Sequence, residues 1–314
     1  MKRISILTPC YNEEENIEKI YAQVKEQFIN IPNYQYEHIF IDNASTDNTV
    51  KLLKNIAALD KNVKIIINAI NAGIIRSWYY GLLQAYGDAV VFIEADLQTP
   101  VDIITALIKK WEEGYKIVAG VKNQSKENPI MCYIRKLYYS IMEKISEKPH
   151  IKNFLGVGLY DQSFIERLRQ QIDDPYPYFR GLVTELGVDI TTVPYIQNKR
   201  KYGKSNASFY ILYDYAMHGF VYQSKLPIRL ASFIGFFIAF LSLIIAIITL
   251  INKLVYWDSY EIGLASVIIG LFFFASIQLM FLGIIGEYIS AIFIQVRKRP
   301  LVIERERINF DTND

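Results

Sequence analysis

Two long apolar runs in the second half of the chain constrain its fold more than any other feature. Residues 230–252 and 262–286 contain no Asp, Glu, Lys or Arg over 23 and 25 positions. A helix of about 20 apolar residues crosses the hydrocarbon core of a bilayer, and neither run carries the polar stripe of a helix that packs on a soluble core. The sequence therefore predicts two transmembrane helices, within a membrane region at 229–296.

The charges around the two runs predict their orientation. Two spans leave both chain ends on one side of the bilayer. The outer flanks are basic, whereas the connecting loop at 253–261 holds one lysine. By the positive-inside rule, the basic side is the cytoplasm. We therefore expect a multi-pass protein of the inner (cytoplasmic) membrane, with a domain at 1–205 and a tail at 297–314 both cytoplasmic.

The stretch between the domain and the membrane region, residues 206–228, carries aromatic side chains at helical spacing. This pattern predicts amphipathic juxtamembrane helices, which lie either in the headgroup region of the bilayer or against the preceding domain. The formal charge of the chain is only +2, from 34 basic and 32 acidic side chains. Such a balance argues against a nucleic-acid partner.

Residues 1–205 have the alternating pattern of an α/β domain. Apolar runs predict strands, and the patterns between them predict helices. Such alternation gives a mainly parallel, Rossmann-like sheet with helices on both faces, and its ligands bind at the carboxyl ends of the strands. The expected strands are 4–8, 37–41, 63–67, 89–93 and 116–120, and the expected helices are 13–28, 47–58, 74–86 and 101–112.

Polar residues follow several of these strands. The first crossover, TPCYNEEEN, contains no glycine-rich phosphate loop, and its three glutamates would repel a diphosphate unless a metal neutralised it. After the fourth strand, Glu94, Asp96 and Gln98 alternate, so on an extended backbone they would point the same way and offer oxygens to Mg²⁺ or Mn²⁺. The alternative is a helix cap or a solvated turn. Asp42 and Asn43 suit a nucleobase or ribose, or else ordinary turn and N-cap chemistry.

Taken in order, the motifs TPCYNEEENI, IDNASTDNTV, NAGIIRSWYYGLLQAYGD and EADLQTP resemble the nucleotide-sugar half of family 2 glycosyltransferases with the GT-A fold. The later motifs YIRKLYYSIMEKIS, KRKYGKSNASF, LPIRLASFIG and GEYISAIFIQVRKRP are similar to polyprenyl-phosphate glycosyltransferases, and best to those that glucosylate bactoprenol. The resemblance implies inverting transfer of a hexose, glucose from UDP-glucose, to undecaprenyl phosphate at the cytoplasmic membrane face. By the same resemblance, the product would serve cell-surface glycan modification and the enzyme would form a homo-oligomer.

Two alternatives stay open at this stage, and a third is disfavoured. One is a mannose synthase of the same kind that uses GDP-mannose. Another is a membrane partner that keeps the fold but is catalytically impaired. A processive polysaccharide synthase is disfavoured, because the chain lacks a Gln-x-x-Arg-Trp motif and has few predicted spans.

The resemblance also implies roles for particular residues. Those for nucleotide-sugar binding are Pro9, Tyr11, Asn12, Glu13, Asp42, Asn43, Ser45, Asn71, Gly73 and Ala95. Those for the metal are Glu94, Asp96 and Gln98, and those for the acceptor phosphate are Arg135, Arg200, Lys204 and Ser205. Asp96 and Asp161 would be catalytic. Because a phosphate acceptor is already an anion near neutral pH, we expect Asp161 to orient the sugar or acceptor rather than to remove a proton.

Three positions depart from the family pattern. Glu94 stands where the family has aspartate, Asn43-Ala44-Ser45 stands where it has Asp-Gly-Ser, and the stretch before Asp161 lacks the usual arginine.

Overall fold

The computed structural model describes residues 1–124, 151–186, 189–198, 217, 219, 221, 226–255 and 264–310. The chain divides into two compact units, Met1–Leu212 together with Arg297–Asp314, and Tyr213–Val296. The four residues expected to bind the acceptor phosphate, Arg135, Arg200, Lys204 and Ser205, lie outside the described residues.

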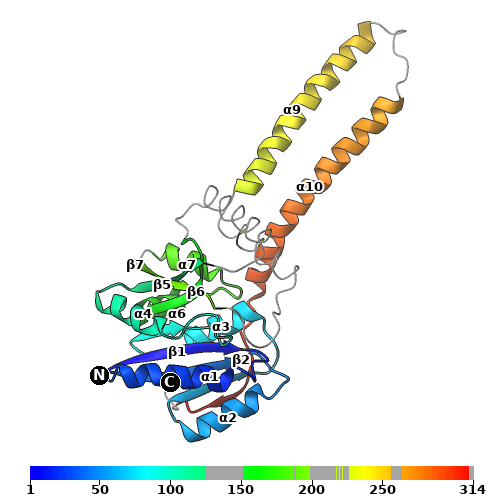
Figure 1. Cartoon of the computed structure of the whole chain (residues 1–314). Helices are drawn as coiled ribbons and strands as arrows, with labels where there is room; N and C mark the ends of the chain where they lie inside the picture. Colours follow the sequence, from blue (N-terminus) through cyan, green and yellow to red (C-terminus); the bar gives the residue numbers. More distant parts are fainter. Residues whose placement is uncertain are drawn as a thin grey trace. The chain divides into compact units, whose positions relative to one another are not determined.

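The first unit is built on an eight-stranded sheet of order β7-β5-β6-β4-β1-β2-β3-β8 (Figure 1). The pairs β1–β2, β1–β4, β2–β3 and β5–β7 are parallel, so the expected mainly parallel α/β sheet is confirmed. The strands are β1 (Lys2–Cys10), β2 (Tyr34–Asp42), β3 (Val63–Asn68), β4 (Ala89–Phe92), β5 (Ile117–Gln124), β6 (Phe154–Asp161), β7 (Ile190–Ile196) and β8 (Glu304–Ile308).

Two strands run against this direction, and the sequence did not predict either. β6 lies between β4 and β5 and is antiparallel to both. It therefore separates the two strands that the alternating pattern would have made neighbours. β8 is antiparallel to β3 and forms an edge of the sheet.

Helices cover both faces of the sheet. Apolar side chains of α1 (Ile17–Asn30), α2 (Thr49–Leu59) and α4 (Ile103–Glu112) pack in one core with Ile6, Phe40 and Ile65. Those of α3 (Ile74–Leu83), α6 (Gln162–Gln171) and α7 (Phe179–Glu185) pack in a second core with Leu7, Ile39 and Ile66. Neighbouring strand residues thus go to opposite cores, as the period of two requires.

The first helix starts later than predicted. It begins at Ile17, and the backbone N–H groups of Asn16 and Ile17 both donate to the Glu13 carbonyl in a preceding turn, at 2.9 and 3.1 Å. The Glu13 N–H donates to Thr49 Oγ1 at the start of α2 at 2.9 Å, and the Glu14 N–H donates to Asp47 Oδ2 in the β2–α2 loop at 3.2 Å. The three glutamates therefore lie in a loop tied to its neighbour and not in a first helical turn.

The segment after residue 297 belongs to the sheet and is not a separate tail. Its strand, with the sequence ERERI, forms an ion pair with α2 and a hydrogen bond with α3. Glu306 pairs with Lys54 of α2 at 2.6 Å, while Glu304 accepts from Tyr80 of α3 at 2.7 Å and from Arg307 at 2.6 Å. Because both faces of β8 meet polar side chains, its sequence shows no apolar alternation, and sequence reasoning read it as a tail.

The second unit contains two long helices, α9 (Leu226–Val255) and α10 (Leu264–Arg297), of 30 and 34 residues. They coincide with the two apolar runs. Within the described part of the chain, one helical segment, Phe273–Arg297 of α10, is long and apolar enough to cross a membrane. A second span in α9 stays a prediction.

Candidate active site

The carboxyl ends of β1, β2, β3 and β4 meet at one edge of the sheet. Cys10 at the end of β1 pairs with Asp42 of β2, and Asp42 pairs with Ile67 of β3. The structure thus gathers at this edge all the residues that the sequence assigned to the nucleotide sugar and the metal: Pro9, Tyr11, Asn12, Glu13, Asp42, Asn43, Ser45, Asn71, Gly73, Glu94, Ala95, Asp96 and Gln98.

The loops after β1 and β2 are joined by hydrogen bonds. Asp42 is buried, and its carboxylate accepts from both the N–H (2.9 Å) and the hydroxyl of Ser45. Ser45 Oγ in turn accepts from the Asn12 N–H at 2.9 Å, and Asn12 Oδ1 accepts from the Thr46 N–H at 2.8 Å. Burial raises the pKa of Asp42, and the bonds from Ser45 partly offset this. Hydrogen bonds thus join the two loops into one shelf at the sheet edge, which includes Asn12, Asp42 and Ser45.

This shelf requires unusual backbone at two positions. Asn12 has φ 55° and Ala44 has φ 63°, both in the left-handed region. Asparagine tolerates that region through local hydrogen bonding, whereas alanine meets a steric cost there that glycine avoids. Ala44 therefore keeps the backbone conformation of a glycine turn without the glycine.

Three asparagines hold the loop after β3. Asn43 is buried, its Nδ2 donates to Asn71 Oδ1 at 2.9 Å, and its Oδ1 accepts from Asn68 Nδ2 at 3.0 Å and from the Ala72 N–H at 2.9 Å. Asn71 Oδ1 also accepts from the Gly73 N–H at 2.9 Å. Asn43 thus supports the 71–73 loop, a positioning role that the sequence had not separated from direct ligand contact.

An acidic pair, Glu94 and Asp96, follows β4 at this edge. Burial, together with the nearby charge of Asp96, raises the pKa of Glu94 to about 7, although Thr99, Lys122 and Arg180 oppose the rise. Thr99 Oγ1 donates to Glu94 Oε2 at 3.5 Å. Lys122 on β5 and Arg180 on α7 were missed by sequence reasoning, because neither lies near a motif.

The backbone here is a turn and not an extended segment. Leu97 has φ 57°, and the Gln98 N–H donates to Asp96 Oδ1 at 3.0 Å. The argument that Asp96 and Gln98 point the same way by strand alternation is therefore wrong. The Gln98 side-chain oxygen accepts from Gln197 Nε2 at 2.5 Å, which directs it toward the segment after β7.

The donor set suits a hard divalent cation that shares its coordination with a ligand. Within the described residues, no group of three or more His, Cys, Asp or Glu side chains could hold an ion. Glu94 and Asp96 nevertheless place two mutually repelling carboxylates together, and a cation would relieve that repulsion. Mg²⁺ is usually bound by one or two carboxylates plus substrate phosphates and water, so the pair fits Mg²⁺ or Mn²⁺.

Asp161, which the sequence predicted to be catalytic, lies at the opposite end of the strands from Glu94, and this position argues against that role. It ends β6, which runs antiparallel, so it pairs with Ala89 at the start of β4. Five residues of extended chain, about 16 Å, separate that position from Glu94. Asp161 is the N-cap of α6: it accepts from the Ser163 N–H at 3.1 Å, and also from Trp111 Nε1 at 2.7 Å and Lys116 Nζ at 3.2 Å.

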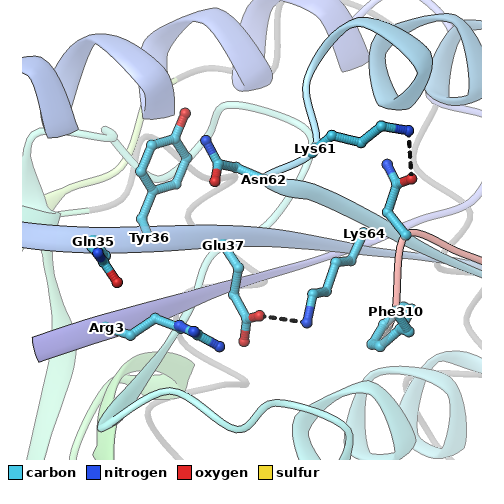
Figure 2. A pocket seen from close by; sticks show the side chains of 9 residues that line it. Arg3, Gln35, Tyr36, Glu37, Lys61, Asn62, Lys64 and Phe310 are labelled. Carbon is cyan, nitrogen blue, oxygen red and sulfur yellow. Dashed lines mark hydrogen bonds and ion pairs between the residues drawn. The ribbon is translucent and has the colours of Figure 1, made fainter. Parts of the chain in front are cut away.

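A cavity of about 670 Å³ also lies away from the acidic pair, at the amino ends of β1, β2 and β3 (Figure 2). Figure 2 shows Glu37 and Lys64 meeting beneath the strands, with N and O atoms 2.9 Å apart, and Phe310 beside them. None of the residues that sequence reasoning singled out lines this cavity. The chemistry of the strand ends, and not the size of this hollow, identifies the candidate site.

Known proteins resemble this chain over nearly its whole length. The family model described as glycosyl transferase family 2 matches residues 5–172. YkcC of Bacillus subtilis (strain 168), an uncharacterized glycosyltransferase, is 31% identical over 300 residues, 95% of this chain and 92% of the relative. The SfII prophage-derived bactoprenol glucosyl transferase of Shigella flexneri is 29% identical over 302 residues, 96% of this chain and 97% of the relative. The bactoprenol glucosyl transferase of Shigella phage SfV is 29% identical over 307 residues, 97% and 99% of the two chains.

Proposed function

Because the chain belongs to glycosyltransferase family 2, we propose that it transfers a hexose from a nucleoside-diphosphate sugar to a polyprenyl phosphate. It is a hexosyltransferase by its family and by its full-length relatives. The observation that carries the proposal is the acidic pair, Glu94 and Asp96, at the same sheet edge as the joined loops of β1 and β2.

The site has what such a transfer needs on the donor side. Mg²⁺ or Mn²⁺ held by Glu94 and Asp96 would neutralise charge on the departing nucleoside diphosphate. The shelf built by Asn12, Asp42 and Ser45 would receive the base and ribose. The 71–73 loop, held by Asn43, would close the site toward the sugar.

The acceptor needs little activation. A phosphate monoester is anionic near neutral pH, since its second pKa is about 6, so its oxygen can attack the sugar carbon without a strong general base. Attack on the face opposite the diphosphate inverts that carbon. The location of Asp161 at the far edge is compatible with this chemistry. Arg135, Arg200, Lys204 and Ser205 remain proposed contacts of the acceptor phosphate.

The membrane arrangement is part of the proposal. We place the catalytic domain at 1–205, juxtamembrane helices at 206–228 and two spans within 229–296, with both ends of the chain in the cytoplasm. The long apolar helix α10 and the basic flanks support this. A lipid phosphate would then reach the enzyme at the inner leaflet.

We propose UDP-glucose as the donor, with GDP-mannose as the runner-up. The test is purified full-length chain with polyprenyl phosphate, Mg²⁺ and a panel of nucleotide sugars, with mass spectrometry of the lipid product. If the lipid gains the mass of one hexose only with UDP-glucose, the result supports UDP-glucose as the donor. The same product only with GDP-mannose overturns the donor and keeps the reaction. No lipid product with any donor overturns the reaction.

The chain's glutamate at position 94 gives one reason to keep the alternative of an impaired partner protein. Calorimetry with UDP, with and without Mn²⁺, separates the two. Metal-dependent binding that is lost in Asp96→Asn and kept in Asp102→Asn supports the enzyme; Asp102 is exposed at the start of α4 and serves as the matched control. Binding that ignores the metal favours the impaired partner.

A further inference from the structure

The chain that leaves α10 returns to the sheet beside the start of α3. β8 pairs with β3, with Asn68 opposite Glu304, and the Ala69 N–H donates to the Ile303 carbonyl at 2.8 Å. Further back along the same segment, the Arg76 guanidinium donates to the Pro300 carbonyl. The segment from Pro300 to Glu304 is therefore held at the end of β3 and at the first turn of α3.

This path brings two arginines together. Arg76 lies in the first turn of α3, three residues after Gly73, and Arg299 directly precedes the proline whose carbonyl Arg76 contacts. Burial, and the neighbouring positive charge of Arg299, lower the pKa of Arg76. Arg299 itself is exposed. One half-buried and one exposed guanidinium thus share a small region at the amino end of a helix, where the helix dipole is also positive.

The Arg76 side chain is incompletely satisfied. Its Nε is shielded from solvent and has no hydrogen-bond partner among the described residues. Buried donors without partners are rare and unfavourable, and like charges side by side add to the cost. An anion at the two guanidinium groups would relieve the charge repulsion. Arginine presents a planar fork of N–H donors that matches phosphate oxygens.

We propose that Arg76 and Arg299 form a binding site for a phosphate group, and that the occupant is the phosphate of the polyprenyl acceptor. The assignment deepens the proposed function and rests on it. Arg299 is three residues beyond Val296, the last residue of the apolar helical unit, so the chain itself ties this arginine to the membrane end of the enzyme. Arg76 follows the 71–73 loop, so the pair also adjoins the proposed donor site.

The test compares the KM for polyprenyl phosphate with the KM for the nucleotide sugar in full-length enzyme in detergent micelles. Arg76→Gln and Arg299→Gln should each raise the acceptor KM by about tenfold to a hundredfold, the loss expected for a charge-assisted hydrogen bond, and leave the donor KM within about twofold. Arg299→Lys, which keeps the charge and loses the fork, should fall between wild type and Arg299→Gln.

Lys298→Gln is the matched control. Lys298 is the neighbouring cation on the same segment, is exposed, and pairs loosely with exposed Asp173 at 3.4 Å. It removes one positive charge near the membrane without touching the arginine pair. An acceptor KM that rises equally in Lys298→Gln would mean general attraction to the membrane surface and would overturn the site.

The remaining outcomes are also decisive. A rise in the donor KM alone would assign the pair to the donor diphosphate and overturn the acceptor assignment. Folding is checked by the slow hydrolysis of nucleotide sugar in the absence of lipid, and if Arg76→Gln fails this check, Arg76→Lys replaces it with the expectation stated for Arg299→Lys. If the wild-type enzyme glycosylates no polyprenyl phosphate, the proposed function fails. Direct binding of radiolabelled polyprenyl phosphate then tests the arginine pair by itself. Weaker binding by the Arg76→Gln and Arg299→Gln variants supports the phosphate site, and unchanged binding overturns it.

Discussion

Replacing Asp161 separates a catalytic role from a structural one. Its carboxylate caps α6 through the Ser163 N–H at 3.1 Å and receives Trp111 Nε1 at 2.7 Å from α4. Loss of the cap costs about 1 kcal/mol, and leaving the buried Trp111 N–H without a partner costs a further 1–3 kcal/mol or so. Asp161→Ala should therefore lose roughly 2–4 kcal/mol of unfolding free energy, which lowers the apparent Tm by about 5–15 °C.

The dependence on pH gives this prediction a second, independent readout. Burial raises the pKa of Asp161. Hydrogen bonds from Ser163, Trp111 and Lys116 lower the pKa by a larger amount, so its net value is below the usual one. A carboxyl group whose folded-state pKa is lowered stabilises the protein above its unfolded pKa of about 3.9, and loses that effect as the pH falls through the folded pKa. The stability gap between wild type and Asp161→Ala should thus be constant from pH 7 to about 5 and shrink below about pH 4.

The assay is thermal unfolding of both proteins in the same detergent, followed by tryptophan fluorescence, together with kcat measured well below either Tm. We expect a large fall in Tm and a kcat within about threefold of wild type. A variant with unchanged Tm and a kcat reduced by a hundredfold or more would refute the structural assignment and restore Asp161 to the reaction.

Three further predictions concern other parts of the catalytic unit. Ala44→Gly should stabilise the protein by about 0.5–1 kcal/mol, since φ is 63° there; a lower Tm would contradict that reading of the loop. Lys64→Met should lower the unfolding free energy by about 3–5 kcal/mol, because it leaves Glu37, whose side chain is 6% exposed, as a buried charge without its ionic partner. Adding Glu37→Gln to this variant should recover most of the loss. Chemical unfolding measures both variants, and an equal loss in the single and the double variant would argue against the buried ion pair. Chelation of divalent metal should abolish sugar transfer and UDP binding together, with recovery on adding Mn²⁺, and full transfer in excess chelator would rule out the role assigned to Asp96.

Much of the donor side could be predicted from the sequence because its signals are local. Apolar runs mark β1 to β4, the polar residues that define the site directly follow them, and the carboxyl ends of parallel strands share one edge. The turn at Leu97 was beyond such reasoning, since only backbone angles show that the chain after Glu94 is not extended. The same holds for Asn43, whose side chain is used to support a loop from a different strand.

The sequence by itself determined the alternating α/β unit and the two long apolar helices, since helix and strand periodicities are written in neighbouring residues. Only the tertiary structure decided where β6 and β8 enter the sheet, because strand order and direction depend on pairing between distant segments. The direction of β6 moves Asp161 to the edge opposite Glu94. The pairing of β8 carries Arg299, 223 residues away in the chain, to the side of Arg76.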